Sequence, residues 1–167
     1  MHSPVAGQPF MSRLTDAELF VLCASRAYRA SRESPASRCP CLPRLFGAVG
    51  LKGALPAFLQ FQIALSADPD RTLTFEERHA RFIGDGEMAL LQALYAWQCD
   101  AACDPRSVLW YIRVRAVRRV AADAGREFAL QMGAAGWILP LRGCYRSPGC
   151  AGLPASAQMH RIARGVH

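Results

Sequence analysis

Apolar residues recur with helical spacing along most of this chain, and short runs of Gly, Pro and Asp separate the periodic stretches. The first stretch predicts a helix over residues 16–31, whose buried face includes Leu19 and Phe20. Thr15 and Glu18 stand at its start with the spacing of a capping box, in which each side chain accepts a backbone N–H of the other residue. Periodicity and capping therefore predict the same helix start.

The middle of the chain repeats this pattern. We expect a short helical turn at 44–49 and two longer helices at 54–67 and 86–98. The helix at 86–98 carries apolar residues on more than one face, so it is expected to be the most enclosed element.

The segment between these two helices carries two competing patterns. Residues 71–75 have the composition of a short strand, although a single strand forms no sheet. Thr74 and Glu77 match a second capping box, which predicts a short helix ending near Phe82. Asp85 is then expected to cap the helix that follows.

The longest periodic stretch runs from Asp104 to Gly136 and predicts one amphipathic helix. Asp104 suits the N-cap and Pro105 suits the first helical position. Gly125 is expected to kink the helix, and Gly133 or Gly136 to end it. The predicted apolar stripe consists of Val114, Val117, Val120, Ala121, Ala124 and Phe128. The opposite face is predicted to expose Arg115, Arg118, Arg119 and Arg126.

Both ends of the chain lack periodicity. We expect a flexible N-terminal tail over residues 1–12 and a basic, disordered tail over 141–167. Residues 13–140 are then a single domain, as the length of 167 residues suggests. The predicted fold class is all-α, an irregular bundle of about five or six helices.

Charge is carried almost entirely by arginine. The formal net charge is +7, with 19 arginines and a single lysine, Lys52. Such a bias is typical of GC-rich bacterial genomes, and this interpretation is favoured over selection for one chemistry. Residues 1–12 show no basic and then apolar pattern of a secretory signal, so a bacterial cytoplasm is the expected compartment.

One apolar span is long enough to need a membrane test. Residues 45–67 contain one charged residue, Lys52, and could cross a bilayer by length alone. However, Lys52 lies inside the span together with Pro56, Gln60 and Gln62, and a charge within lipid is costly. We therefore expect a buried helix of a globular domain and no membrane partner.

The cysteines suggest one possible metal site. Seven cysteines are present, and two close pairs lie in predicted loops beside helix ends. Zinc takes four thiolate or imidazole ligands in a tetrahedron, and His79 could replace one thiolate. Unligated thiols are the favoured alternative, so no cofactor is expected unless zinc binds. The candidate ligands are Cys39, Cys41, Cys99 and Cys103.

Ionisable residues give no enzyme signature. Glu76, Glu77, Asp85 and Glu87 lie near His79, but acidic residues at helix starts complement the helix dipole and are read here as capping groups. The chain has no G-x-S-x-G, P-loop or H-E-x-x-H motif. A non-enzymatic role is therefore favoured.

The arginine face offers a second candidate site. Arginine beside an aromatic residue suits phosphate contact and base stacking. The favoured alternative is a solvated face, paired with the acidic stretch 68–87 of the same chain. The candidate residues for an anionic partner are Trp110, Arg113, Arg115, Arg118, Arg119 and Arg126.

Three functions follow from these patterns. The leading hypothesis is a non-enzymatic helical accessory or regulatory module that acts through macromolecular contacts, to a protein partner or to a second copy of itself. The second is a nucleic-acid-binding regulator that uses the arginine-rich helix at 105–132. The third is a structural or sensory protein based on zinc or thiols.

Overall fold

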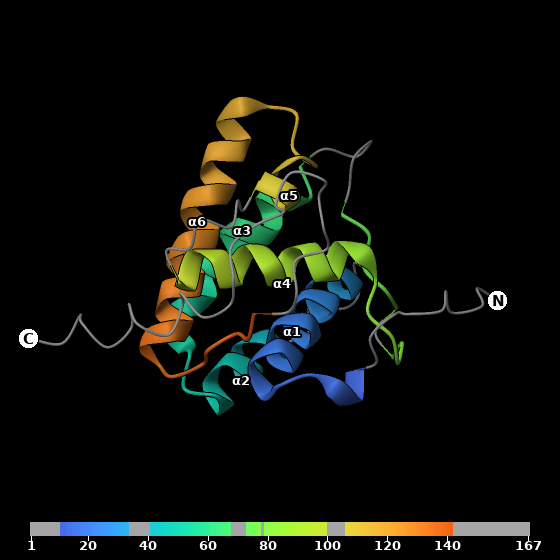
Figure 1. Ribbon diagram of the computed structural model, residues 1–167, viewed down its shortest axis with the longest axis vertical. Helices are drawn as coiled ribbons and strands as arrows, with labels where there is room; N and C mark the ends of the chain where they lie inside the picture. The colour runs from blue at the N-terminus through green and yellow to red at the C-terminus, as the bar shows by residue number, and fades with distance from the viewer. Residues whose placement is uncertain (1–10, 34–40, 68–72, 78, 100–105, 142–167) are drawn as a thin grey trace, which may run out of the picture.

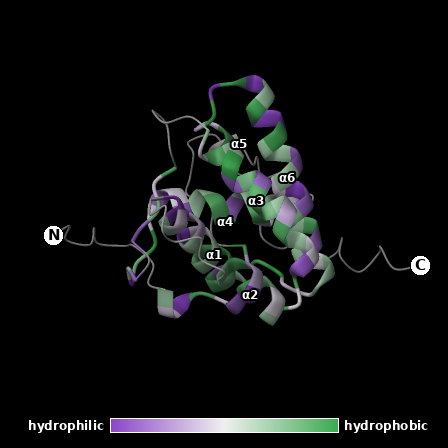
Figure 2. Ribbon diagram, turned by 180° about the vertical axis from the view of Figure 1, so that it is seen from behind, coloured by the Kyte–Doolittle hydropathy of each residue, from purple (hydrophilic) through white to green (hydrophobic). Residues whose placement is uncertain are grey.

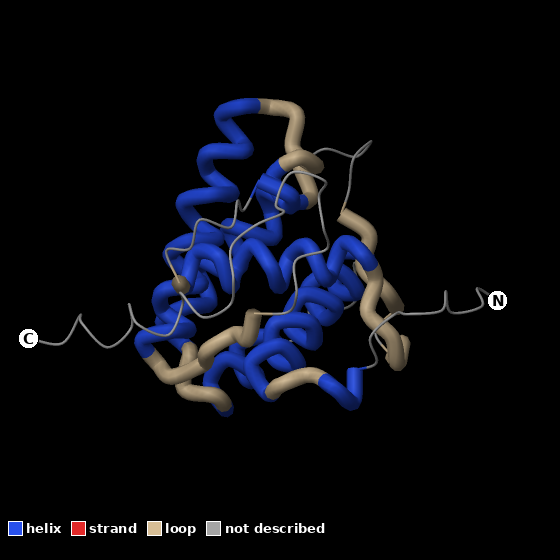
Figure 3. The backbone as a smooth tube through the Cα atoms, viewed as in Figure 1, coloured by secondary structure: helices blue, strands red, loops and turns tan. Residues whose placement is uncertain are grey.

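The computed structural model describes residues 11–33, 41–67, 73–77, 79–99 and 106–141, and this part of the chain is all-α, as predicted. Figure 3 shows its helices and connecting loops, with no strand among the described residues. The helices are α1 (Asp16–Glu33), α2 (Cys41–Ala48), α3 (Leu55–Leu65), α4 (Asp85–Gln98), α5 (Arg106–Leu109) and α6 (Arg115–Ala134). Two 3-10 turns, η1 (Met11–Arg13) and η2 (Lys52–Ala54), complete the described elements.

Helix α6 packs most extensively against α3 and α4, and α4 crosses it in Figure 1. Aromatic rings fill the space where these helices meet α2. Phe46 and Phe58 have ring centroids 5.1 Å apart, and Phe58 and Phe128 have centroids 5.3 Å apart. All three side chains are fully buried, and such aromatic pairs contribute beyond their buried area. This core holds α6 in place and fixes which of its faces points outward.

The predicted start of the first helix is confirmed, and the last helix ends before Gly136, one of the two glycines predicted to end it. The Thr15 N–H donates to Glu18 Oε2 at 2.8 Å, and the Glu18 N–H donates to Thr15 Oγ1 at 3.4 Å, which forms the capping box of α1. After α6, Gly136 adopts a φ of 82° and the Trp137 N–H donates to the Met132 carbonyl at 2.9 Å. This is the glycine-containing turn that commonly closes a helix.

The prediction of one long helix over 104–136 is wrong. The chain forms the single turn α5, leaves the helix near Trp110 and begins α6 at Arg115. Ile112 is 2% exposed and Ala121 is 0% exposed. In one continuous helix these two residues would lie about 180° apart around the axis, so only one could face the core. The interruption allows both to be buried.

The predicted apolar stripe of this helix is only partly right. Ala124 and Phe128 are buried, and Val117 is half-buried. Val114 and Val120, by contrast, are 58% and 41% exposed. The reason is that the first turns of α6 extend past the helices that cover its later turns (Figure 1).

Gly125 packs against neighbouring helices, and α6 continues through it without interruption. A Cβ atom at Gly125 would collide with the ring of Trp97 and would lie 3.0 Å from the ring of Phe61. The glycine therefore permits α6 to approach α4 and α3 closely, a role that replaces the kink predicted there.

The short helix predicted to end near Phe82 is also wrong. Residues 73–84 form an irregular segment in the described part of the chain. The Arg26 guanidinium donates hydrogen bonds to the carbonyls of Ala80 and Phe82. In a helix these carbonyls would instead accept backbone N–H groups of the same helix. Gly84, and not Asp85, is the N-cap residue of α4.

The long apolar span 45–67 does not form one helix. It divides into the end of α2, a turn at Gly50 with a φ of 75°, the turn η2 and the helix α3. Among the described helices, none combines the length and the apolarity that a membrane span requires.

Some predictions fall on residues outside the described part of the chain. These are the cap at Asp104 and Pro105, most of the tails at 1–12 and 141–167, and part of the possible strand at 71–75. Within the first tail, Met11 is held in η1, and its N–H donates to the Arg81 carbonyl at 2.8 Å.

Candidate functional site

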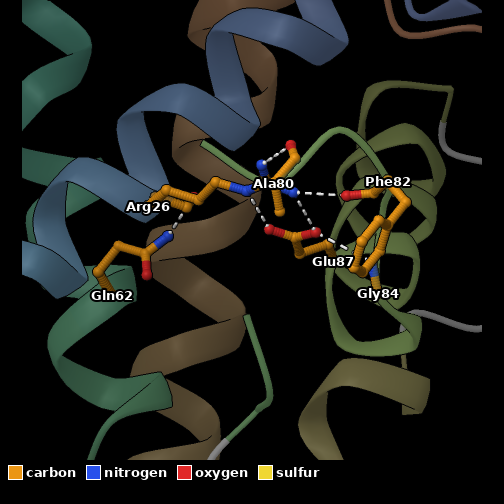
Figure 4. Close-up of polar contacts among 7 residues, drawn as sticks. Arg26, Gln62, Ala80, Phe82, Gly84 and Glu87 are labelled. Carbon is orange, nitrogen blue, oxygen red and sulfur yellow. Dashed lines mark hydrogen bonds and ion pairs between the residues drawn. The ribbon is translucent and has the colours of Figure 1, made fainter. Parts of the chain in front are cut away.

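One charged pair is buried where α1 meets the start of α4. Arg26 and Glu87 are 3% and 0% exposed, and their side chains face each other in Figure 4. Arg26 Nε donates to Glu87 Oε1 at 2.6 Å and Nη2 donates to Oε2 at 2.8 Å, a bidentate pair. Arg26 also donates to the carbonyls of Ala80 at 2.8 Å and Phe82 at 3.0 Å. Glu87 accepts the N–H of Gly84 at 3.0 Å.

These contacts account for the stability of a charge inside the core. Burial by itself lowers the pKa of Arg26, but the hydrogen bond and the negative charge of Glu87 outweigh burial, and the net pKa is raised. Beside this pair, Gln62 Nε2 of α3 donates to Ser25 Oγ of α1 at 2.8 Å. Gln62 Oε1 is buried without a hydrogen-bond partner, but the contacts of Arg26, Glu87 and Gln62 Nε2 join different helices, so we assign these groups to holding α1, α3 and α4 together.

Arg26 is the residue that the sequence prediction missed, and Glu87 was interpreted only as a capping residue. A signal was present. Arg26 follows Leu22 by four residues and precedes Arg29 by three, which places all three on one face of α1. Leu22 is fully buried, and Arg29 lies over the ring of Phe75 at 4.5 Å. An arginine on an apolar helix face requires a buried acceptor, and Glu87 supplies it.

A second charged group lies on the outside, on α6. Arg115, Arg119 and Arg126 are exposed as predicted. Their spacings of four and seven residues place them within about 40° of one another around the helix axis, along about 16 Å of its length. The three side chains therefore form one edge of the exposed face. Figure 2 shows hydrophilic and hydrophobic positions next to each other along this helix.

Two predicted residues lie in the loop before α6 and not on a helix. Trp110 is 70% exposed, and Arg113 is exposed. Arg118, although exposed, has a local role. Its Nε and Nη2 donate to the Ile112 carbonyl at 3.0 and 2.7 Å, which fastens this loop to α6. We define the arginine surface as the exposed residues Trp110, Val114, Arg115, Arg119, Arg126 and Leu130.

The arginines of α6 do not pair with the acidic stretch 68–87 in the described part of the chain. Glu87 of this stretch pairs with Arg26 of α1, and Arg115, Arg119 and Arg126 take part in no ion pair with the described residues. The described residues 73–84 and helix α6 lie on opposite sides of the molecule in Figure 1. Residues 68–72 fall outside the described part. The predicted pairing of the arginine face with the acidic stretch is therefore not formed by the described residues between 73 and 87.

The beginning of α6 also lacks the usual neutralising groups. Its N-cap, Val114, has no side-chain hydrogen bond, and its first turn contains no acidic residue. Arginine near the positive end of a helix dipole is unfavourable, so positive potential accumulates at this corner.

The proposed zinc ligands are only partly described. Cys41 is half-buried in the first turn of α2, and Cys99 is exposed at the end of α4. Cys39 and Cys103 lie outside the described residues, so the four-ligand site stays a prediction. Within the described ranges, no three His, Cys, Asp or Glu side chains group as metal ligands. His79 is exposed.

The fold and these two groups define an all-α domain with a closed internal ion pair and an exposed basic surface. Comparison of the chain with protein families, with curated proteins and with solved structures finds no match. The assignment of function therefore depends on the geometry of the molecule itself.

Proposed function

We propose that this protein is a non-enzymatic helical accessory or regulatory module of a bacterial cytoplasm that binds another macromolecule through the arginine surface. The observation that carries the proposal is the single edge formed by Arg115, Arg119 and Arg126, which have no ion pair in the described chain, together with the exposed Trp110 in the loop before α6. The cores of protein interfaces are enriched in Trp and Arg, which also dominate binding energies.

The buried polar groups support a non-enzymatic role. Arg26 and Glu87 satisfy each other and nearby backbone groups, and both are at most 3% exposed. A catalytic group needs access to a substrate, which these side chains lack. The exposed residues of α6 are therefore the better candidates for function.

A nucleic acid is the second candidate partner. From Arg106 to Ala122 the sequence contains five arginines and no Asp or Glu, which favours a polyanion. Such a protein would bind through α6 and the loop before it. The single helix predicted at 105–132 is not available for this, because the chain is not helical from residue 110 to residue 114.

The proposal is tested by photo-crosslinking in the cells that produce the protein. A benzophenone amino acid replaces Trp110, which is 70% exposed. In a comparison variant it replaces Ile138, which is 59% exposed and lies outside the arginine surface. We expect a crosslink to a distinct macromolecule from position 110 that disappears when Arg115, Arg119 and Arg126 are changed to Glu. Equal crosslinking with and without the three arginines would contradict the proposal.

The matched control changes three other exposed basic residues, Arg44, Lys52 and Arg81, to Glu. Both triple variants lower the formal net charge from +7 to +1, because each reversal removes two charges. The control variant should retain the crosslink. Its loss in both variants would show that net charge, and not the arginine surface, determines the contact.

A further inference from the structure

We infer that the arginine surface recognises an acidic segment of a partner protein in which carboxylates alternate with apolar side chains. This inference rests on the proposed function and names the chemistry of the partner. It is carried by the positive charge of Arg115, Arg119 and Arg126, which have no ion pair among the described residues, and by exposed apolar residues on α6 and in the loop before it.

The charge of the surface requires a negative partner. Arg115, Arg119 and Arg126 lie on one edge and have no ion pair among the described residues. A guanidinium binds a carboxylate through two parallel hydrogen bonds, so three arginines along about 16 Å suit a row of carboxylates on an extended segment or on a helix face. Such pairs steer association and fix the register of the partner.

Because the surface also exposes apolar residues, a partner that covers it must carry apolar side chains as well as negative charge. Trp110 is 70% exposed, Val114 58% and Leu130 48%. Leu130 follows Arg126 by four residues, so the two are neighbours on the same helix face. Removal of such side chains from water is favourable only against other apolar groups. A partner that covers both kinds of residue must itself carry both.

Nucleic acid fits this surface less well than protein does. Phosphate contacts are commonly made by Lys, Ser, Thr, Asn, Gln and Tyr in addition to Arg, and from Trp110 to Leu130 only Tyr111 belongs to these six types. Valine and leucine side chains, moreover, find little apolar surface on a phosphate backbone.

The C-terminal residues of the chain do not supply an acidic segment for this surface. Residues 142–167 contain four arginines and no Asp or Glu, so their charge has the wrong sign. Two arginine surfaces facing each other would bring like charges together, which opposes a symmetric dimer through this face. A different protein is therefore the favoured occupant.

Two parallel selections on the purified full chain test this inference. A displayed library of random 16-residue peptides, and a pool of random 40-nucleotide DNA and RNA strands, are each selected on the wild type at about 0.15 M salt. Counter-selection uses the variant with Arg115, Arg119 and Arg126 changed to Glu. The control variant with Arg44, Lys52 and Arg81 changed to Glu reports the effect of net charge.

We expect enriched peptides that combine Asp or Glu with Leu, Ile, Phe or Trp. Their affinity should fall at least tenfold with the triple variant of the surface and several-fold with Trp110→Ser, and change little with the control variant. Replacement of the apolar residues of a selected peptide by Ser should also weaken binding at least tenfold.

Three outcomes would overturn the inference: no enriched peptide, peptides that are acidic without apolar residues, or nucleic acids that bind this surface more tightly than any peptide. The last outcome would leave the proposed function in place and replace only the class of partner. An absent crosslink at position 110 in cells would instead contradict the proposed function, so the two failures are distinguishable.

Discussion

Removal of the buried arginine should be among the most damaging single changes to this fold. Arg26→Met replaces the guanidinium with an apolar group of similar length and leaves Glu87 fully buried with the Gly84 N–H as a remaining hydrogen-bond partner. Breaking one side of a buried ion pair costs about 3–5 kcal/mol, because the other charge is left without compensation. The carbonyls of Ala80 and Phe82 also lose their donor, but the partly buried segment that carries them can turn toward water.

The expected change is large enough to measure without ambiguity. For a chain of this size, each kcal/mol shifts Tm by about 2–4 °C, so Arg26→Met should lower Tm by roughly 6–20 °C. Urea unfolding followed by far-UV circular dichroism measures the change in free energy, with an unchanged m value if the native state stays compact.

A second substitution separates the charge from simple loss of packing. Glu87→Gln removes the stranded charge and retains an oxygen that can accept the Gly84 N–H. We therefore expect the double variant Arg26→Met with Glu87→Gln to be about 1–3 kcal/mol more stable than Arg26→Met alone. The cost of the single change should also be similar at low and at high salt, because ions screen a buried pair poorly. A loss below 1 kcal/mol, or a double variant less stable than the single one, would refute the buried-pair argument.

Three further predictions concern packing and the loop before α6. Gly125→Ala should destabilise the fold by about 1–3 kcal/mol, because its Cβ would meet aromatic rings of α3 and α4. Gly133→Ala is the control, because its Cβ would make only van der Waals contact, and it should be neutral or stabilising by up to about 1 kcal/mol. Equal losses of unfolding free energy for Gly125→Ala and Gly133→Ala, measured by urea unfolding, would contradict the packing argument. Phe128→Ala should cost about 3–5 kcal/mol, since the ring is fully buried; a loss under 1 kcal/mol in the same assay would be inconsistent with that position. Arg118→Ala should lower the free energy of unfolding by about 0.5–1.5 kcal/mol, because the hydrogen bonds to the Ile112 carbonyl are lost. Arg119→Ala should change it by no more than about 0.5 kcal/mol. Identical thermal melts of the two variants would contradict a role of Arg118 in holding the loop.

Local signals in the sequence were sufficient for much of the fold. The capping pair Thr15 and Glu18 located the start of α1, and the end of α6 was predicted at Gly133 or Gly136, of which Gly136 is the one with a positive φ. These features depend on residues within one turn of each other, so no knowledge of the tertiary structure is needed to predict them.

The errors arose where tertiary contacts outweigh local preference. Residues 104–136 have helical periodicity throughout, but Ile112 is out of phase with Ala121, and both reach the core only through a break. The segment ending near Phe82 was predicted as a helix, and its backbone instead supplies acceptors to Arg26, which is distant in sequence. The helical phase of the apolar residues over 104–136 indicates the break before α6. The loss of the helix near Phe82 follows from a contact with Arg26 that no local pattern shows.

The candidate site shows the same division between what sequence determines and what it does not. Exposure of Arg115, Arg119 and Arg126 was predicted from the apolar stripe alone and is confirmed. That prediction grouped Arg118 with them, because side-chain identity does not show that its guanidinium is bound to a loop carbonyl. It also placed Trp110 on a helix face, although this residue lies in the loop.

Arginine has two different structural roles in the described part of this chain. Arg26 neutralises a buried carboxylate, and Arg118 holds a loop carbonyl. Arg115 and Arg119 do neither, and Arg115 lies at the first position of α6, where the helix dipole disfavours a positive charge. The number of arginines in the chain does not explain why some of them are bound to protein groups and others are not. The residues that contribute nothing evident to folding are the ones whose substitution should alter binding while leaving the fold intact, and this difference is the basis for assigning function to the arginine surface.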